Sequence, residues 1–122
     1  YAHGLPERGA AFFWIDQKKT GMLGLWHAGY GPLAMRLHIA FRMSVEGVLQ
    51  SAAALRARGV QPLGFNGEPI EEPIAIGWMP AVAQYFCDPD GHLIEFIAVL
   101  DEAPDPEFGI RAYSEWLTRT GR

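Results

Sequence analysis

The chain of 122 residues has little of what marks several large classes of protein. Its one cysteine, Cys87, excludes an internal disulfide, which is typical of a reducing cytoplasm. No apolar run approaches the length of about 20 residues that spans a bilayer. The chain also does not open on a charged segment followed by an apolar one, as a secretory signal would. We therefore expect a cytoplasmic protein that does not enter a membrane.

Basic residues are also scarce. Ten lysines and arginines stand against 14 aspartates and glutamates, which gives a net charge of −4, and they form no basic stripe or polybasic cluster. Nucleic acid and membrane surfaces are therefore not expected as partners. The remaining composition, 49% hydrophobic and 20% charged, is that of an ordinary globular protein, and the length fits one domain.

The most informative segment is Tyr85–Val99, YFCDPDGHLIEFIAV. Pro89 presets its own φ and Gly91 accepts a positive φ, so the DPDG sequence predicts a tight turn between two strands. Both faces of the second strand are apolar except at Glu95. An ionised carboxylate there is costly unless it has a partner. A metal ion is one such partner.

The rest of the chain alternates between strand and helix patterns. In chain order, these patterns predict strands at Ala10–Asp16 and Met22–Trp26 that form a hairpin, a strand at Met35–Met43, a helix at Val45–Arg58, a strand at Val60–Phe65, strands at Ala81–Cys87 and His92–Leu100, and a terminal helix within Ile110–Thr120. Ser44 and Gly59 are typical residues for the start and end of the first helix. The order between residues 35 and 100 is therefore βαβββ.

Three segments are predicted to be irregular: Tyr1–Gly9, Asn66–Pro80 and Asp101–Gly109. The middle segment contains three prolines and three glutamates, and loops of this length inside a domain usually have a function. It also contains Trp78, a large apolar residue that is unusual in a loop. We expect Trp78 to cover a pocket as a lid or to lie in a dimer contact.

The βαβββ order, with HIAF at 38–41 and YFCDPDGHLIEF at 85–96, resembles the vicinal oxygen chelate superfamily, which includes glyoxalase I, extradiol dioxygenases and bleomycin-binding proteins. The resemblance implies an α+β fold in which βαβββ modules form a curved mixed sheet. Residues 35–100 would be a complete second module, residues 1–34 a first module represented by its last hairpin, and residues 101–122 a C-terminal tail. The absent strands of the first module imply a chain that is incomplete at its N-terminus.

In metal-using members of the superfamily, the ligands come from the first and last strands of each module. Carried over to this chain, the resemblance implies that His38 and Glu95 hold a divalent ion such as Zn, Ni, Fe, Mn or Co. The closing position of the first module falls at Gly24, which has no ligand atom. His27 is the nearest imidazole, but its odd spacing from Gly24 places it on the other face unless a β-bulge intervenes. The alternative is that His38 and Glu95 form only a buried hydrogen bond.

The resemblance implies a glyoxalase-like lyase or isomerase, in which the metal chelates two adjacent oxygens of a small substrate and Glu95 moves the proton. A metal-free binding protein of the bleomycin-resistance type and an extradiol dioxygenase stay open as alternatives. A homodimer is expected, because an exposed sheet edge needs covering. The residues expected at the substrate pocket are Phe12, Trp14, Trp26, Arg36, Trp78 and Tyr85.

Two residues near this site have a second interpretation. Arg36 would either bind an anionic substrate or pair with a nearby carboxylate. His92 follows the turn glycine and lies on the opposite face from Glu95, so we expect it to stabilise the turn or a neighbouring strand.

Overall fold

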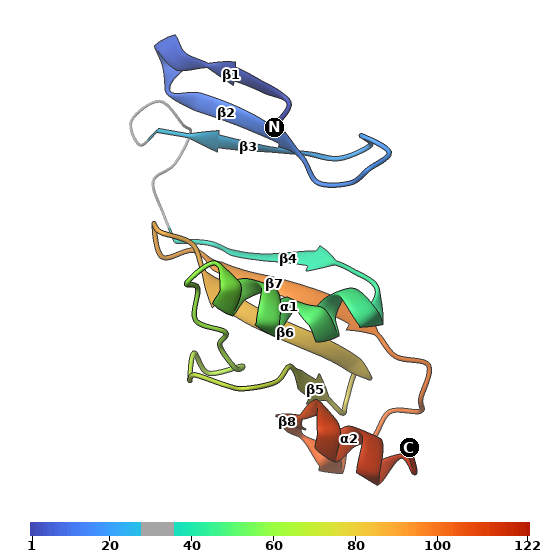
Figure 1. The fold of residues 1–122 in the computed structure, drawn as a ribbon. Helices are drawn as coiled ribbons and strands as arrows, with labels where there is room; N and C mark the ends of the chain where they lie inside the picture. Colours follow the sequence, from blue (N-terminus) through green and yellow to red (C-terminus); the bar gives the residue numbers. More distant parts are fainter. Residues whose placement is uncertain (28–35) are drawn as a thin grey trace. The chain divides into compact units, whose positions relative to one another are not determined.

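The computed structural model describes residues 1–27 and 36–122. The chain divides into two compact units, Tyr1–Met35 and Arg36–Arg122. The fold class is α+β, as predicted: the described residues form two α-helices and two separate sheets (Figure 1). In these ranges, no helix combines the length and the apolar character needed to cross a bilayer.

The first unit contains an antiparallel sheet of three strands, in the order β1 (His3–Leu5), β2 (Ala10–Trp14), β3 (Met22–Trp26). The predicted hairpin is confirmed as β2 and β3. The prediction that residues 1–9 form only loop is wrong, because β1 pairs with β2 and is followed by a 3-10 turn at Pro6–Arg8. Backbone hydrogen bonds form β1, and they need no alternating apolar pattern that the sequence would reveal.

The second unit contains a five-stranded mixed sheet in the order β4-β7-β6-β5-β8. Strands β4 and β7 are parallel, and the other pairs are antiparallel. Its elements are β4 (His38–Arg42), α1 (Val45–Ala57), β5 (Ile74–Ile76), β6 (Ala81–Cys87), β7 (Leu93–Val99), β8 (Ile110–Ala112) and α2 (Tyr113–Arg119). The βαβββ order is present as β4, α1, β5, β6 and β7, but its second strand is β5 and not the predicted Val60–Phe65. Met35, where we expected the first of these strands to begin, lies outside the described residues.

The signals at the ends of α1 act as the sequence predicts. The backbone N–H of Gly47 donates to Ser44 Oγ over 3.0 Å, so Ser44 is the N-cap. Gly59 has a φ of +72°, the left-handed conformation that ends many helices. These two residues limit the helix to within one residue of its predicted bounds.

The DPDG turn is also confirmed. Gly91 has a φ of +85°, and the Asp88 carboxylate accepts from the backbone N–H groups of Asp90 and His92 over 3.0 and 2.8 Å. The ladder that follows pairs Tyr85 with Glu95. This turn therefore determines which residue of β6 lies opposite the carboxylate.

Two predictions about the far edge of the sheet are wrong. Val60–Phe65 is not a strand and makes only isolated bridges at Leu63, while Ile74–Ile76, expected inside a loop, forms β5. The predicted terminal helix starts later than expected, because Ile110–Ala112 pairs with β5 as β8. Both short strands form through partners distant in the sequence, which local periodicity does not detect.

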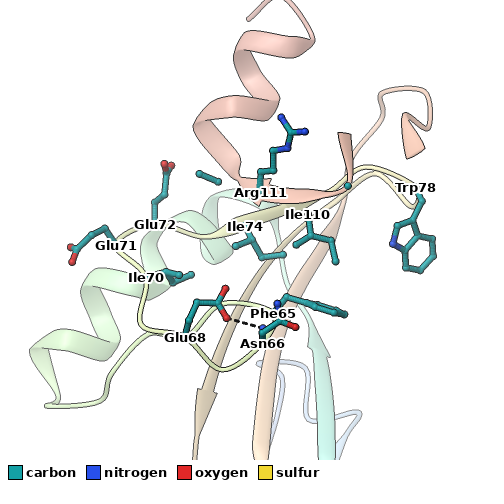
Figure 2. Close-up of a pocket in the computed structure, with 12 residues that line it drawn as sticks. Phe65, Asn66, Glu68, Ile70, Glu71, Glu72, Ile74, Trp78, Ile110 and Arg111 are labelled. Atoms are coloured by element: carbon teal, nitrogen blue, oxygen red, sulfur yellow. Dashed lines mark hydrogen bonds between the residues drawn. The ribbon is translucent and has the colours of Figure 1, made fainter. Parts of the chain in front are cut away.

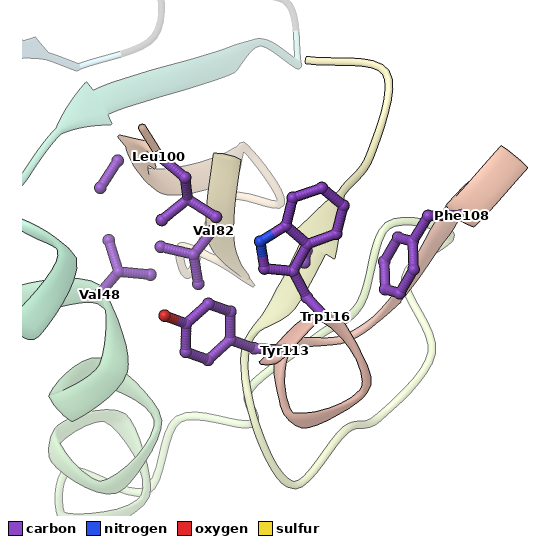
Figure 3. Close-up of a cluster of buried hydrophobic side chains, with 8 residues drawn as sticks. Val48, Val82, Leu100, Phe108, Tyr113 and Trp116 are labelled. Atoms are coloured by element: carbon purple, nitrogen blue, oxygen red, sulfur yellow. The ribbon is translucent and has the colours of Figure 1, made fainter. Parts of the chain in front are cut away.

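The main core lies between the sheet and the two helices (Figure 3). Val48 of α1 and Val82 of β6 are fully buried, and Trp116 of α2 is buried beside them. The ring of Phe108 meets Trp116 edge-on, with 5.0 Å between the ring centroids. Residues 101–122, predicted as a tail, therefore complete this core through Phe108, Tyr113 and Trp116. On the opposite face, the described residues that pack together come from strands and loops and include no residue of α1 or α2.

Candidate functional site

A histidine, a glutamate and a tyrosine meet on the face of the five-stranded sheet that the helices do not cover. They come from three neighbouring strands: His38 from β4, Glu95 from β7 and Tyr85 from β6. Glu95 pairs with Tyr85 across one ladder and with Ala40 across the other. Since strand residues two apart share a face, His38 lies on the same side as Ala40 and Glu95.

Both oxygens of the Glu95 carboxylate have a partner. Tyr85 Oη donates to Oε1 over 2.8 Å, and His38 Nε2 lies 3.0 Å from Oε2. Glu95 and Tyr85 are buried, whereas 52% of the His38 side chain is exposed. The group of three therefore runs from a buried hydroxyl, through a buried carboxylate, to an imidazole that solvent or a ligand can reach.

The tyrosine is held in its protonated form. Burial, reinforced by the hydrogen bond to Glu95 and by its negative charge, raises the pKa of Tyr85 well above its ordinary value. Its hydroxyl therefore stays protonated to a higher pH than that of an ordinary tyrosine, and it donates to Glu95. Tyr85 holds one oxygen of Glu95 and so orients the other toward His38.

The His38–Glu95 pair has the chemistry and spacing of two metal ligands. Imidazole nitrogen and carboxylate oxygen suit divalent transition metals. Two ligand atoms that each lie about 2.1 Å from one ion are about 3.0 Å apart when the angle between them is a right angle. The observed separation of 3.0 Å fits that spacing, and it also fits a hydrogen bond. In the part of the chain that the structure describes, no third histidine, cysteine, aspartate or glutamate joins them.

His92 has the structural role that the sequence predicts. Its Nδ1 accepts from the backbone N–H of Leu37 over 2.8 Å, just before β4 begins. The hydrogen bond ties β4 to the turn between β6 and β7, and so helps to place His38 beside Glu95. Arg36 lies next to this turn and packs over Gly91, where an added Cβ would stand 3.2 Å from the Arg36 Nε.

The aromatic residues predicted for the pocket fall into separate regions. Phe12, Trp14 and Trp26 share one face of the sheet in the first unit, with Phe12 directly opposite Gly24. The rings of Phe12 and Trp26 meet edge-on, 6.1 Å between centroids, and Phe12 covers Gly24. Trp78 lies in the second unit and is 57% exposed.

His27 is placed by the ladder between β2 and β3, which runs from Ala10–Trp26 to Trp14–Met22 without a bulge. Alternation along the strand therefore places His27 on the opposite side from Gly24. His27 was expected to join the metal ligands only if a β-bulge brought it to the face of Gly24, and the β2–β3 ladder has no such bulge.

Sequence reasoning had assigned Tyr85 to the pocket but had missed its bond to Glu95. The signal was present in the DPDG turn. Once Asp90 is placed at the centre of the turn, residues equally far before and after it pair, and Tyr85 and Glu95 are each five positions away.

Comparison with known proteins gives one informative match. No protein-family model matches the chain, and no curated protein does. Among solved structures, the chain is similar to HFX_CASS4, an integron cassette protein from the mobile metagenome of a sewage outfall in Halifax Harbour. The identity is 30%, the TM-score is 0.62, and the match covers 79% of this chain and 75% of that one.

Proposed function

We propose that this chain, which belongs to the same family as the integron cassette protein, is a small metal-dependent enzyme of the glyoxalase type. The name of that relative states no activity, so the proposal rests on the residues of this chain. Its substrate would be a small molecule with two adjacent oxygens. The observation that carries the proposal is the pair of possible metal-ligand atoms, His38 Nε2 and Glu95 Oε2, which lie 3.0 Å apart, with the His38 side chain half exposed.

In this proposal, His38 and Glu95 hold a divalent ion together with water, substrate or ligands from outside the described residues. A bound ion of this kind would act as a Lewis acid that stabilises negative charge on a substrate oxygen. The exposure of His38 leaves this side of the pair open to a substrate. Glu95 is the one carboxylate at the pair, so it is the residue proposed to accept and return a proton.

Tyr85 is proposed as a positioning residue. A buried carboxylate with one free oxygen would turn toward other donors. The hydroxyl of Tyr85 prevents this by donating to Oε1 over 2.8 Å. Its loss should therefore weaken metal binding without removing a ligand, by about 10-fold to 100-fold as for other outer-sphere partners.

The test is the metal content and metal affinity of the purified protein. The wild-type protein, purified without chelators, should contain close to one transition-metal ion per chain. Glu95→Gln should lose most of the bound metal because the ligand loses its charge. His38→Gln should lose most of it because the imidazole is removed. Competition with a chromogenic chelator then gives the Zn²⁺, Ni²⁺ and Mn²⁺ affinities of each variant and of Tyr85→Phe.

Glu107→Gln is the matched control, since 90% of that glutamate side chain is exposed and it lies outside the site. It should retain the wild-type metal content. A metal-free wild-type protein that also binds none of the three added ions would contradict the proposal. So would a Glu95→Gln variant that binds metal as tightly as the wild type.

A metal-free binding protein is the second candidate. It is favoured by the fact that the described residues bring together two metal-ligating side chains rather than three. The half-buried Leu93 and Ile97 beside Glu95 on β7 would then contact an apolar ligand. The metal measurements separate the two candidates, and a protein that takes up iron specifically would favour dioxygenase chemistry.

A further inference from the structure

A concave site lies at the β5–β8 edge of the five-stranded sheet. It is a cavity of about 670 Å³, within the range of small-molecule sites, between β5, β8, the segment that precedes β5 and Trp78 (Figure 2). Its lining includes neither His38, Tyr85 nor Glu95. The sequence singled out Asn66–Pro80, which includes β5, for its glutamates and for Trp78, and the function proposed above uses neither.

The floor and one wall of this cavity are apolar. Ile74 of β5 and Ile110 of β8 form the floor. They lie on one face of the ladder as diagonal neighbours, because Ile74 pairs with Ala112 and Ile110 pairs with Ile76. Phe65 and Trp78 stand at the side, and 48% and 57% of these residues are exposed. Two large aromatic side chains at the mouth of one cavity provide faces on which an apolar or cationic group can stack.

The opposite side of the cavity is acidic, with Glu68 and Glu72 as its key groups (Figure 2). The carboxylates of Glu68 and Glu72 both accept hydrogen bonds from neutral donors. Glu68 accepts from the backbone N–H of Asn66 over 2.8 Å, and Glu72 accepts from the hydroxyl of Ser114 over 2.6 Å. These bonds hold the two carboxylates in place without neutralising their charge.

The nearby cations are paired elsewhere. Arg56 Nη2 lies 3.3 Å from Glu71 Oε2. Arg111 also lines the cavity, but its guanidinium lies 5.4 Å from the ring centroid of Phe108 and its Nη1 is 3.9 Å from Glu115 Oε2. Two negative charges in the cavity therefore lack a positive partner among the described residues.

We propose that this cavity binds a small organic cation, with its apolar body against Phe65, Trp78 and Ile110 and its positive charge toward Glu68 and Glu72. The apolar floor disfavours a hydrated inorganic ion, and the two carboxylates disfavour an anion. This cavity and the proposed metal site share no residue, and they meet where the rings of Phe65 and Tyr85 lie edge-on with 6.1 Å between their centroids.

The test uses rhodamine 6G, a planar apolar cation, and fluorescein, a planar anion of related structure, with binding followed by fluorescence anisotropy. Rhodamine 6G should bind the wild-type protein saturably at one site per chain, and more weakly as salt is raised. Glu68→Gln and Glu72→Gln should each weaken binding by about threefold, and the double variant by about tenfold. Glutamine keeps the acceptor oxygen for Asn66 or Ser114, so these variants should unfold at the wild-type temperature.

Trp78→Leu should also weaken rhodamine binding by about threefold, through loss of the cation–π contact. Glu107→Gln should bind rhodamine as the wild type does, because this exposed glutamate does not line the cavity. The proposal is overturned if the wild type does not bind rhodamine 6G saturably. Equal affinity for fluorescein, or wild-type affinity in the double glutamine variant, would also overturn it.

Discussion

The two faces of the five-stranded sheet are built from the same strands but have opposite chemistry. On β7, Phe96 and Ala98 point to the face that α1 covers, where Trp116 of α2 is fully buried (Figure 3). Glu95 and Ile97 point to the other face, where the carboxylate meets His38 and Tyr85. One residue along the strand therefore changes the surroundings from an apolar core to a polar site.

The two faces differ in the hydrogen-bond donors that they offer, which explains why the buried Glu95 carboxylate is tolerated on one of them. Polar groups on the helix-covered face find fewer partners: the Trp116 Nε1 and Gln84 Oε1 atoms are buried without a hydrogen bond to a described residue. On the other face, a neighbouring strand on each side supplies a donor to Glu95. A buried charge is stable where such donors are fixed in the backbone register, and costly where apolar helix side chains are the neighbours.

The largest expected difference comes from placing an aspartate on each face in turn. Ala98→Asp buries an unpaired charge in the core, because Ala98 is 3% exposed, and should cost about 4 kcal/mol or more. Val99→Asp, one residue later and 65% exposed, should cost about 1 kcal/mol or less. Urea unfolding followed by circular dichroism measures both losses. Equal losses would show that the two faces do not differ as described.

A matched pair of tryptophans tests the helix-covered face alone. Trp116→Ala removes a fully buried side chain and should lower the free energy of unfolding by about 3–5 kcal/mol. Trp78→Ala removes an exposed one and should change it by about 0.5 kcal/mol or less. Urea unfolding of both variants, each with wild-type protein alongside, provides the measurement. A large loss from Trp78→Ala would mean that residue 78 packs in a core.

Tyr85→Phe tests the polar face. It removes the donor to Glu95 Oε1 and leaves the buried carboxylate with one partner, so the free energy of unfolding should fall by about 1–2 kcal/mol. Double-mutant cycles with Glu95→Gln should show coupling between the two changes, because they act on one hydrogen bond. Additive effects in such a cycle would contradict the bond.

The smallest expected effect is a pH dependence that also depends on Tyr85. Because the folded-state pKa of Tyr85 is raised above the ordinary value of 10.0, its contribution to stability is complete below that pH. It is lost as the pH rises above about 10, where the unfolded tyrosine ionises and the folded one does not. Urea unfolding at pH 9, 10 and 11 should show a steeper alkaline loss in the wild type than in Tyr85→Phe. Parallel profiles would show that this hydroxyl is not held protonated by the fold.

Helices and strands that are bounded by caps and turns could be predicted from the sequence. Ser44 and Gly59 marked the ends of α1, and the DPDG turn with its alternating flanks placed β6 and β7 within one residue of their bounds. The expectation that His38 and Glu95 act together came from the resemblance to the vicinal oxygen chelate superfamily, and the structure places His38 Nε2 3.0 Å from Glu95 Oε2. The predictions from caps and turns succeeded because turn chemistry and side-chain alternation act over a few residues.

The β5–β8 edge of the sheet and the cavity beside it could be known only from the tertiary structure. Ile74–Ile76 is too short to show a period, and it is a strand because β6 and β8 both pair with it. Val60–Phe65 had the apolar content of a strand, but Pro62 lacks a backbone donor and the segment forms isolated bridges instead. The cavity beside Ile74 and Ile110 likewise forms only because β5, β8 and the segment around Glu68 come together in the folded chain. Contacts between residues far apart in the chain set all three features, and local sequence patterns do not encode them.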